Sequence, residues 1–240
     1  MTAGLFGLKK RVLTPELMDD PALDAAVHAQ ALRGLEKINT VSFSAQTLWS
    51  AIQRFYKDSG KKPLRILDIA CGAGDMVLKL AVRARRENLP LSFEGCDFNP
   101  QAVAYAQTRA AAAGAVGVNF FVLDALRDVI PARFDMVINS LFLHHLSEAQ
   151  ALLFFKTLAR SQTRCIVISD LRRSRRGWLL AFLGSRLLTR SHVVHVDALL
   201  SVEAAWTPEE ISALTRVAGL PSAQITFVWP MRYLLTWQNP

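Results

Sequence analysis

The 240-residue sequence contains only three cysteines, Cys71, Cys96 and Cys165, which lie far apart and form no C-x-x-C pair. This scarcity excludes a disulfide framework and argues against a zinc site built on thiolates. The sequence also lacks the ordered regions of a signal peptide, and no apolar run approaches the roughly 20 residues that cross a bilayer. These absences predict a cytoplasmic protein, either soluble or peripheral to a membrane.

Acidic residues are scarce relative to basic ones. The chain has 20 Asp and Glu against 28 Lys and Arg, so its formal net charge is +8. Such a charge suits RNA, an anionic membrane surface or an acidic substrate, and it does not distinguish among them. Hydrophobic residues make up 51% of the chain, which is enough for a sizeable core in one large domain.

Short apolar runs of strand length alternate with stretches of helical length through the middle of the chain. The alternation predicts parallel strands joined by crossover helices, as in an α/β fold. The expected strands cover residues 64–69, 91–96, 118–123, 134–139 and 165–170. The expected helices cover residues 75–86, 100–113 and 147–159.

The pattern changes after residue 170. A basic and apolar insert, 171–206, precedes a helix that Thr207 caps and Gly219 ends, with Pro208 in its first turn and Glu210 completing a capping box. Strands at 223–229 and 232–237 follow, and a link of two residues forces antiparallel pairing. Helices at 21–38 and 45–56 are interpreted as an N-terminal cap. One domain is therefore expected, with a cap (1–60), a cofactor-binding core (61–170), the insert (171–206) and a final helix and hairpin (207–240).

The join between the first strand and its helix carries the strongest functional signal. Gly72 and Gly74 permit positive φ and let a ligand lie against the backbone, where the following helix offers free N–H groups. Asp97 and Asp124 end the next two strands and suit a ribose diol and a purine amine, although each could simply cap a helix. Val77 departs from the dinucleotide fingerprint, so a dehydrogenase is a weaker alternative. The nearby carboxylates Asp68 and Asp75 favour a cationic ligand, which indicates a sulfonium nucleoside.

The segment "ILDIACGAGD", residues 66–75, resembles the first motif of the class I S-adenosylmethionine-dependent methyltransferases. Ala70 replaces the first glycine of that motif, as is common in the members that act on ubiquinone and menaquinone precursors. The resemblance extends from residue 64 to about 237. It implies a Rossmann-like α/β fold whose seven-stranded, mostly parallel sheet has the order 3-2-1-4-5-7-6, an antiparallel last strand and helices on both faces, and it implies S-adenosylmethionine as the cofactor.

The resemblance also implies roles for single residues. Asp68 and the backbone around the glycine turn would hold the methionine part of the cofactor, and "NSLFLHHL", residues 139–146, resembles the segment that passes beside it. The implied cofactor-binding residues are Asp68, Ala70, Cys71, Gly72 and Gly74 for the methionine part, Asp97 for the ribose, Phe98, Asp124 and Ala125 for the adenine, and Asn139 and Ser140 beside the methionine.

Two adjacent histidines, His144 and His145, follow the fourth strand beside the expected methyl donor. Imidazole titrates near neutral pH, so either is a candidate general base, with His144 preferred. The alternative is that one caps the next helix while the other is solvated. His192 and His195 in the insert are a second possibility. Their i, i+3 spacing also permits metal ligation, but no acidic or thiolate partner is adjacent, and no metal is predicted.

The residues around these histidines bear on the acceptor. Methyltransferases of nucleobase amines resemble one another in an Asn/Asp-Pro-Pro-aromatic tetrad, whereas this chain reads "NSLF" from Asn139. The insert carries six arginines interleaved with apolar residues and no acid between 171 and 190. This pattern is typical of an interfacial helix at an anionic membrane, and it equally suits a lid over an apolar substrate or a packed helix with a solvated basic rim.

These observations predict methyl transfer to a small acceptor, a phenol or quinol with or without an alkyl tail, with O-methylation favoured over C-methylation. The expected partners are this lipophilic aromatic acceptor and an anionic membrane surface. The alternative is a methyltransferase that acts on RNA or another macromolecule, although no RNA-binding fold flanks the domain.

Overall fold

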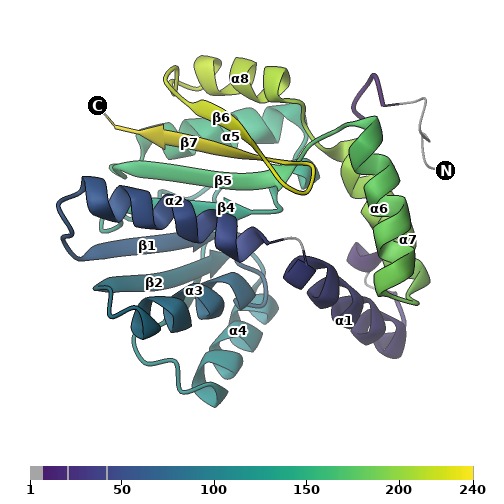
Figure 1. The fold of residues 1–240 in the computed structure, drawn as a ribbon, viewed down its shortest axis with the longest axis horizontal. Helices are drawn as coiled ribbons and strands as arrows, with labels where there is room; N and C mark the ends of the chain where they lie inside the picture. The colour runs from purple at the N-terminus through teal and green to yellow at the C-terminus, as the bar shows by residue number, and fades with distance from the viewer. Residues whose placement is uncertain (1–7, 21, 42, 240) are drawn as a thin grey trace.

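A seven-stranded sheet forms the centre of the molecule (Figure 1). The structure, a computed structural model, describes residues 8–20, 22–41 and 43–239. The strand order is β3-β2-β1-β4-β5-β7-β6, and every pairing is parallel except those of β7 with β5 and β6. This order confirms the predicted fold class. The strands are β1 (Leu64–Ile69), β2 (Leu91–Asp97), β3 (Asn119–Val122), β4 (Met136–Ser140), β5 (Cys165–Leu171), β6 (Gln224–Val228) and β7 (Arg232–Gln238).

Helices cover both faces of the sheet because successive strand residues point to opposite sides. Ile66 and Ile138 pack into a cluster with α2 (Ser44–Asp58), α3 (Asp75–Arg86) and α4 (Pro100–Ala112). The neighbouring Leu67 and Val137 pack into a second cluster with α5 (Glu148–Arg160) and α8 (Pro208–Val217). The strands are buried on both faces, which explains why their sequences are continuous apolar runs.

Helix start and stop signals in the sequence correspond to the observed ends. Ser147 and Thr207 each accept a hydrogen bond from the backbone three residues later, which forms the capping boxes of α5 and α8. Gly114 and Gly219 follow α4 and α8 with positive φ. The expected boundaries differ from the observed ones by one or two residues for most elements, since helix and strand ends fray.

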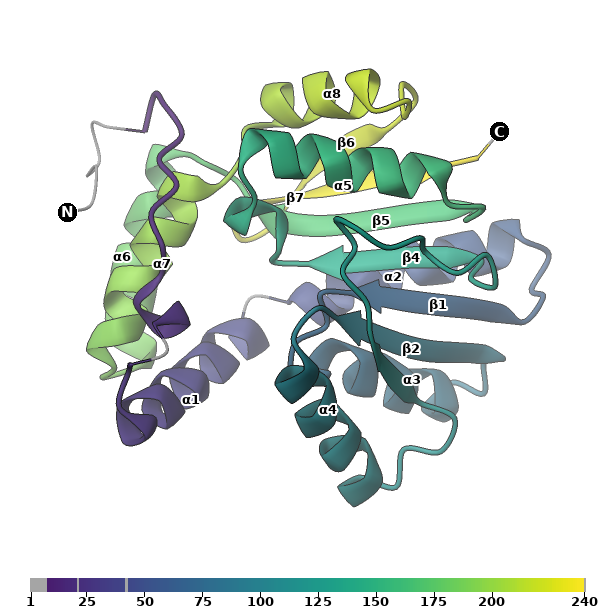
Figure 2. The ribbon, with the colours of Figure 1, turned by 180° about the vertical axis from the view of Figure 1, so that it is seen from behind.

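A third group of helices packs at the carboxyl ends of the parallel strands (Figure 2). It comprises the short helix η1 (Leu17–Asp19), α1 (Ala25–Val41), α6 (Arg175–Leu188) and α7 (His192–Ala204). Ala31 of α1 packs against Val193 and Val194 of α7. The expected N-terminal cap is thus divided, because α2 covers the sheet while α1 joins the two helices of the insert. Pro21, the expected start of α1, lies outside the described residues.

Every helix in the described ranges is too short or too polar to cross a bilayer. The arrangement instead places one layer of helices, with the segment 8–20, beside the strand ends that carry the predicted site residues.

Candidate active site

The glycine turn between β1 and α3 leaves bare backbone at the edge of the sheet. Gly72 and Gly74 have φ of 51° and 76°, in the left-handed region that favours glycine. A Cβ on Gly72 would meet no atom within 4 Å, whereas a Cβ on Gly74 would lie 2.6 Å from Phe120 Cζ. Gly72 therefore leaves space for a ligand, and Gly74 is required by packing. Ala70 also has a positive φ, 55°, although it carries a Cβ.

Asp97, at the end of β2, is buried and is bonded to the glycine turn. Its Oδ2 accepts a hydrogen bond from the Gly72 backbone N–H at 2.9 Å, and its Oδ1 accepts one from the Asn99 N–H at 3.0 Å. Each carboxylate oxygen has a second lone pair, so a ribose hydroxyl can still donate to it. The backbone N–H of Cys71 donates to the Cys96 carbonyl at 3.0 Å, which also fixes the turn against β2.

Asp68 is a buried carboxyl that receives no hydrogen bond from the described residues. Burial, together with the nearby charge of Asp97, raises the pKa of Asp68 to about 8. A carboxylate in such a position becomes favourable when a cation lies beside it. This environment fits the ammonium and sulfonium charges of S-adenosylmethionine.

The end of β4 offers two further polar atoms. Asn139 Nδ2 donates to the Ile69 carbonyl at 2.7 Å, which links β4 to β1, but Asn139 Oδ1 and Ser140 Oγ are buried and find no hydrogen-bond partner in the part of the chain that the structure describes. Buried polar atoms are nearly always paired in native proteins, so these two are suited to a ligand. The structure brings both residues to the same sheet edge as the glycine turn.

The residues expected around the adenine lie beyond β2 and β3. Asp124 Oδ1 accepts from the Leu126 N–H at 2.9 Å, and its Oδ2 lies 3.4 Å from Arg127 Nε, so this side chain organises its own turn. The described residues between β3 and β4 form no helix, so Asp124 does not cap one. Ala125 is buried, and the Phe98 ring is 67% exposed at the end of β2. The exposed ring leaves an aromatic surface available to an adenine.

His144 and Asp170 form a buried pair at the ends of β4 and β5. His144 lies in η2 (Leu143–His145), and its Nδ1 is 2.6 Å from Asp170 Oδ1. Asp170 also accepts hydrogen bonds from the backbone N–H groups of Phe142, His144 and Leu171, so it positions both the ring and its loop. Burial disfavours the imidazolium, but the charge and hydrogen bond of Asp170 outweigh it and raise the pKa of His144. Because Nδ1 is engaged, Nε2 is the nitrogen left to exchange a proton.

Glu16, from the segment before α1, approaches the free side of this pair. Its Oε1 is 4.0 Å from His144 Nε2 and accepts a hydrogen bond from Ser201 Oγ. Burial raises the pKa of Glu16. The backbone N–H groups of Leu17 and Met18 donate to Asp197 at 2.7 and 3.0 Å, which fixes η1 on α7.

Among the described residues, Glu16, His144 and His145 form a group whose ligand atoms all lie within 4.8 Å of one another, as a metal ion would need. The two imidazole rings are 4.2 Å apart, and desolvation together with His144 lowers the pKa of His145 to about 4. His192 and His195 lie elsewhere, at the start of α7, and His195 Nε2 lies within hydrogen-bonding distance, 2.9 Å, of the Thr189 carbonyl.

Sequence reasoning missed Asp170 and Glu16. Asp170 had a usable signal, because it ends an apolar strand run as Asp97 does. Glu16 had none, since it lies in an irregular segment and meets His144 only in the folded chain.

The sheet order, the glycine turn and the acids at the strand ends together define the fold of the class I methyltransferases. Residues 66–163 match the family described as "Methyltransferase domain". This part of the chain is therefore similar to a methyltransferase domain, and its sheet order is that of the class I methyltransferase fold. No protein of curated function matches the chain.

Solved structures share the fold at low sequence identity. The apo form of the S-adenosylmethionine-dependent methyltransferase SibL aligns with a TM-score of 0.67 at 20% identity over 98% of this chain. Magnesium protoporphyrin IX methyltransferase (ChlM) from Synechocystis PCC 6803, with bound SAH, aligns at 0.58 and 18% over 93% of this chain and 91% of its own. The plantazolicin methyltransferase BamL, in complex with a triazolic desmethylPZN analog and SAH, aligns at 0.67 and 15% over 89% and 91%.

Several matched proteins are longer than this chain. The chain spans 65% of the SibL structure, and 50% and 60% of two further matched structures.

Proposed function

We propose that this protein transfers a methyl group from S-adenosylmethionine to the hydroxyl oxygen of a small, lipophilic aromatic acceptor, a phenol or quinol. The observation that carries the proposal is the buried His144–Asp170 pair, placed at the strand ends next to Asn139 and Ser140. A hydroxyl acceptor must lose its proton as it is methylated, and a positioned imidazole is an efficient base for this step.

The strand edges would hold the cofactor. The open backbone at Gly72 and the carboxyl of Asp68 would take the methionine part, and Asp97 would accept from the ribose hydroxyls. Phe98, Asp124 and Ala125 would surround the adenine. When bound, S-adenosylmethionine supplies an electrophilic methyl group, and its sulfonium sulfur becomes a neutral thioether once the methyl group is transferred. The protein then contributes mainly alignment and exclusion of water.

His144 Nε2 would receive the acceptor proton. Asp170 holds the ring by Nδ1 and stabilises the imidazolium that forms, because its carboxylate is fixed 2.6 Å away and cannot turn aside. Glu16, 4.0 Å from Nε2 on the other side, would bound the space in which the acceptor hydroxyl sits.

A small acceptor is favoured over a nucleobase. The segment at residues 139–142 reads Asn-Ser-Leu-Phe and so lacks the paired prolines typical of enzymes that methylate base amines. Two matched structures are named for small-molecule acceptors, magnesium protoporphyrin IX and plantazolicin. The net charge of +8 keeps an RNA-associated methyltransferase as the second candidate.

The test compares His144→Gln with His145→Gln on a panel of alkylated phenols and quinols. We expect His144→Gln to lower kcat by about 10²-fold or more and to leave the affinity for S-adenosylhomocysteine within about twofold, measured by calorimetry. Mass spectrometry with NMR of the product distinguishes O- from C-methylation.

Three results would contradict the proposal. If His144→Gln turned over at nearly the wild-type rate, His144 would be excluded as the general base. Methylation of total RNA but of no small acceptor would favour the second candidate. Loss of activity in a chelator, restored by a divalent cation, would indicate that Glu16, His144 and His145 hold a metal ion instead.

A further inference from the structure

The outward side of α6 carries leucines and arginines only. Its four leucines are 42 to 84% exposed, although leucine is usually buried. Residues 171–190 contain no Asp or Glu, so no acid neutralises this surface from the same segment. We name it the arginine–leucine face, and it consists of Arg175, Arg176, Leu179, Leu180, Leu183, Arg186 and Leu187, with Arg190 just beyond the helix.

The inward side of the same helix is firmly packed. Gly177 and Ser185 are buried against the molecule, and Trp178 Nε1 donates to Glu203 Oε1 of α7 at 3.1 Å. Arg173 also points inward, where it is buried and pairs with Glu210 at 2.6 Å. The leucines are therefore exposed on a helix whose orientation is fixed, and Arg173 does not belong to the basic surface that the sequence suggested.

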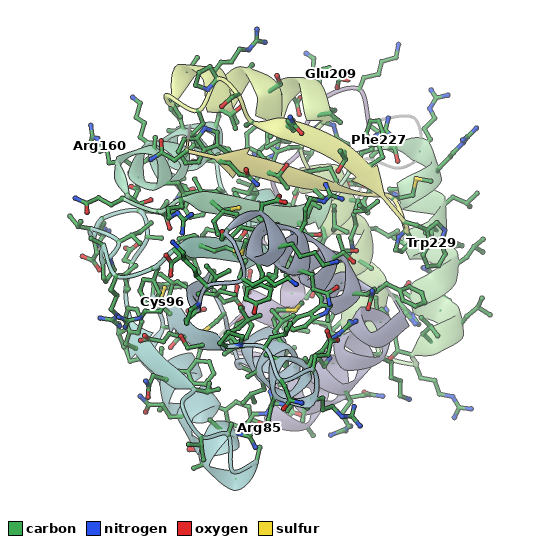
Figure 3. The ribbon with its side chains drawn as sticks, turned by 60° about the vertical axis from the view of Figure 1, so that its left-hand side comes forward. Arg85, Cys96, Arg160, Glu209, Phe227 and Trp229 are labelled. Carbon is green, nitrogen blue, oxygen red and sulfur yellow. The ribbon has the colours of Figure 1, made fainter. Side chains whose placement is uncertain are left out.

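The turn between β6 and β7 adds exposed aromatic residues beside the start of α6. Phe227 and Trp229 are 62% and 63% exposed and lie on the side of the molecule where α6 is found (Figure 3). The Arg172 guanidinium lies 4.2 Å from the Phe227 ring centre, and the Arg172 backbone N–H donates to the Met231 carbonyl at 3.0 Å. The turn therefore packs beside the start of α6.

We propose that the arginine–leucine face, with the turn that carries Trp229, binds the surface of an anionic lipid bilayer. The helix lies flat, its leucines enter the boundary between headgroups and acyl chains, and its guanidinium groups pair with lipid phosphates. Tryptophan is the residue favoured at that boundary, since its ring is amphipathic. The 14 residues of α6 extend only about 21 Å, so the helix rests on the bilayer and does not cross it.

Two other occupants fit this surface less well. RNA would be bound by open aromatic faces, but on α6 Trp178 and Phe182 stack on each other with ring centroids 5.6 Å apart, and the exposed residues between the arginines are aliphatic. The two exposed rings near the β6–β7 turn already have partners, because the Arg172 guanidinium lies over Phe227 and the Phe43 ring contacts Trp229. A second copy of this chain, docked about a two-fold axis, would bring the arginines of one copy against those of the other.

The test is co-sedimentation of the full chain with vesicles of phosphatidylcholine alone or with about one third phosphatidylglycerol. We expect binding to the anionic vesicles at least tenfold tighter than to the neutral ones, weakening as salt is raised. Leu180→Ser/Leu187→Ser and Arg176→Gln/Arg186→Gln should each reduce binding at least fivefold.

The matched controls are Leu153→Ser, a leucine on α5 that is as exposed as Leu180, and Arg160→Gln, an exposed arginine on the same helix. Both should bind as the wild type does, and all variants should keep the wild-type affinity for S-adenosylhomocysteine.

The proposal fails if anionic vesicles do not bind at low salt, or if the controls lose as much affinity as the face variants. It also fails if single-stranded RNA at equal phosphate concentration displaces the vesicles. A wild-type dimer in light scattering that Leu180→Ser/Leu187→Ser converts to a monomer would assign the face to self-association instead.

Discussion

At the scale of single residues, the proposed chemistry depends on which charges Asp170 and His144 carry. The free imidazole is the form that accepts a proton, so activity should rise with pH through the pKa of His144. Asp170 raises that pKa against the effect of burial. The rising part of the pH profile is therefore expected above the ordinary histidine value of about 6.5.

The substitution Asp170→Asn removes the charge that favours the imidazolium. We expect the rising part of the kcat profile to move to lower pH, and the maximal kcat to fall by about 10²-fold because the ring is no longer held in its productive orientation. Measurement of kcat between pH 5 and 9 at saturating cofactor tests this expectation. Asp58→Asn, an exposed change at the end of α2, should leave the profile in place. If the pH profile of kcat in Asp170→Asn kept the wild-type midpoint, the His144–Asp170 pair would not be the group whose titration controls the reaction.

Asp68 poses the opposite problem, because its carboxyl has no hydrogen-bond partner among the described residues. Its pKa of about 8 lies above its unfolded value, so the folded chain holds a proton that the unfolded chain has released. The free energy of unfolding should therefore decrease as pH rises from about 4 to about 8. A bound cation would reverse this penalty.

The substitution Asp68→Asn should accordingly stabilise the ligand-free protein and weaken the cofactor complex. We expect a gain of about 1 to 3 kcal/mol at pH 8, little change near pH 4, and at least a tenfold loss of affinity for S-adenosylmethionine. Urea denaturation at several pH values and calorimetry measure the two effects. An unchanged affinity would exclude Asp68 from the cofactor site.

At the scale of secondary-structure elements, the glycine turn shows how packing and ligand space are divided between two neighbouring glycines. Gly74→Ala introduces a Cβ 2.6 Å from the Phe120 ring at a φ of 76°. Gly114→Ala has a similar φ, 57°, but its Cβ meets nothing within 4 Å. We expect Gly74→Ala to lower the free energy of unfolding by about 3 kcal/mol or more, and Gly114→Ala to lower it by about 1 kcal/mol. Urea denaturation measures both losses of stability. Equal losses would mean that the Phe120 ring of β3 moves aside easily to make room for the new Cβ.

Most elements follow from the sequence because local rules decide them. Strands buried on both faces require unbroken apolar runs, and caps such as Ser147 and Thr207 act within four residues. The division of the insert at residues 189–191 and the separation of α1 from α2 depend on packing between distant segments. Gly34 illustrates this, since it lets α1 approach Thr189, which is far away in sequence.

The same division applies to the candidate site, where local rules predict some residues and contacts between distant segments determine the others. The residues at β-strand ends were found because parallel strands bring their carboxyl ends together. Asp170 was accessible to the same rule. Glu16 was not, because nothing near it in the sequence indicates its contact with Ser201 or its approach to His144.

At the scale of the whole molecule, the segment 8–20 connects the helical layer to the catalytic loop. Arg11 donates hydrogen bonds to the carbonyls of Ala204, His144 and Leu146 at 2.5, 2.9 and 2.6 Å. Its guanidinium also lies 3.8 Å from the centre of the Trp206 ring. One side chain thus holds the end of α7 and the loop of His144 in a fixed relation.

This arrangement predicts that Arg11 affects turnover without touching the cofactor. In Arg11→Met the three carbonyls lose their donor, so we expect a loss of about 2 to 4 kcal/mol of stability and a fall in kcat of at least tenfold, with the affinity for S-adenosylhomocysteine unchanged. Arg11→Lys should recover only part of the loss, because one ammonium group cannot reproduce the planar fork of a guanidinium. Lys10→Met, an exposed neighbour, should change stability by no more than about 0.5 kcal/mol. If Arg11→Met kept full turnover, the contacts of the segment 8–20 would serve stability alone, and the position of His144 would be set entirely by Asp170.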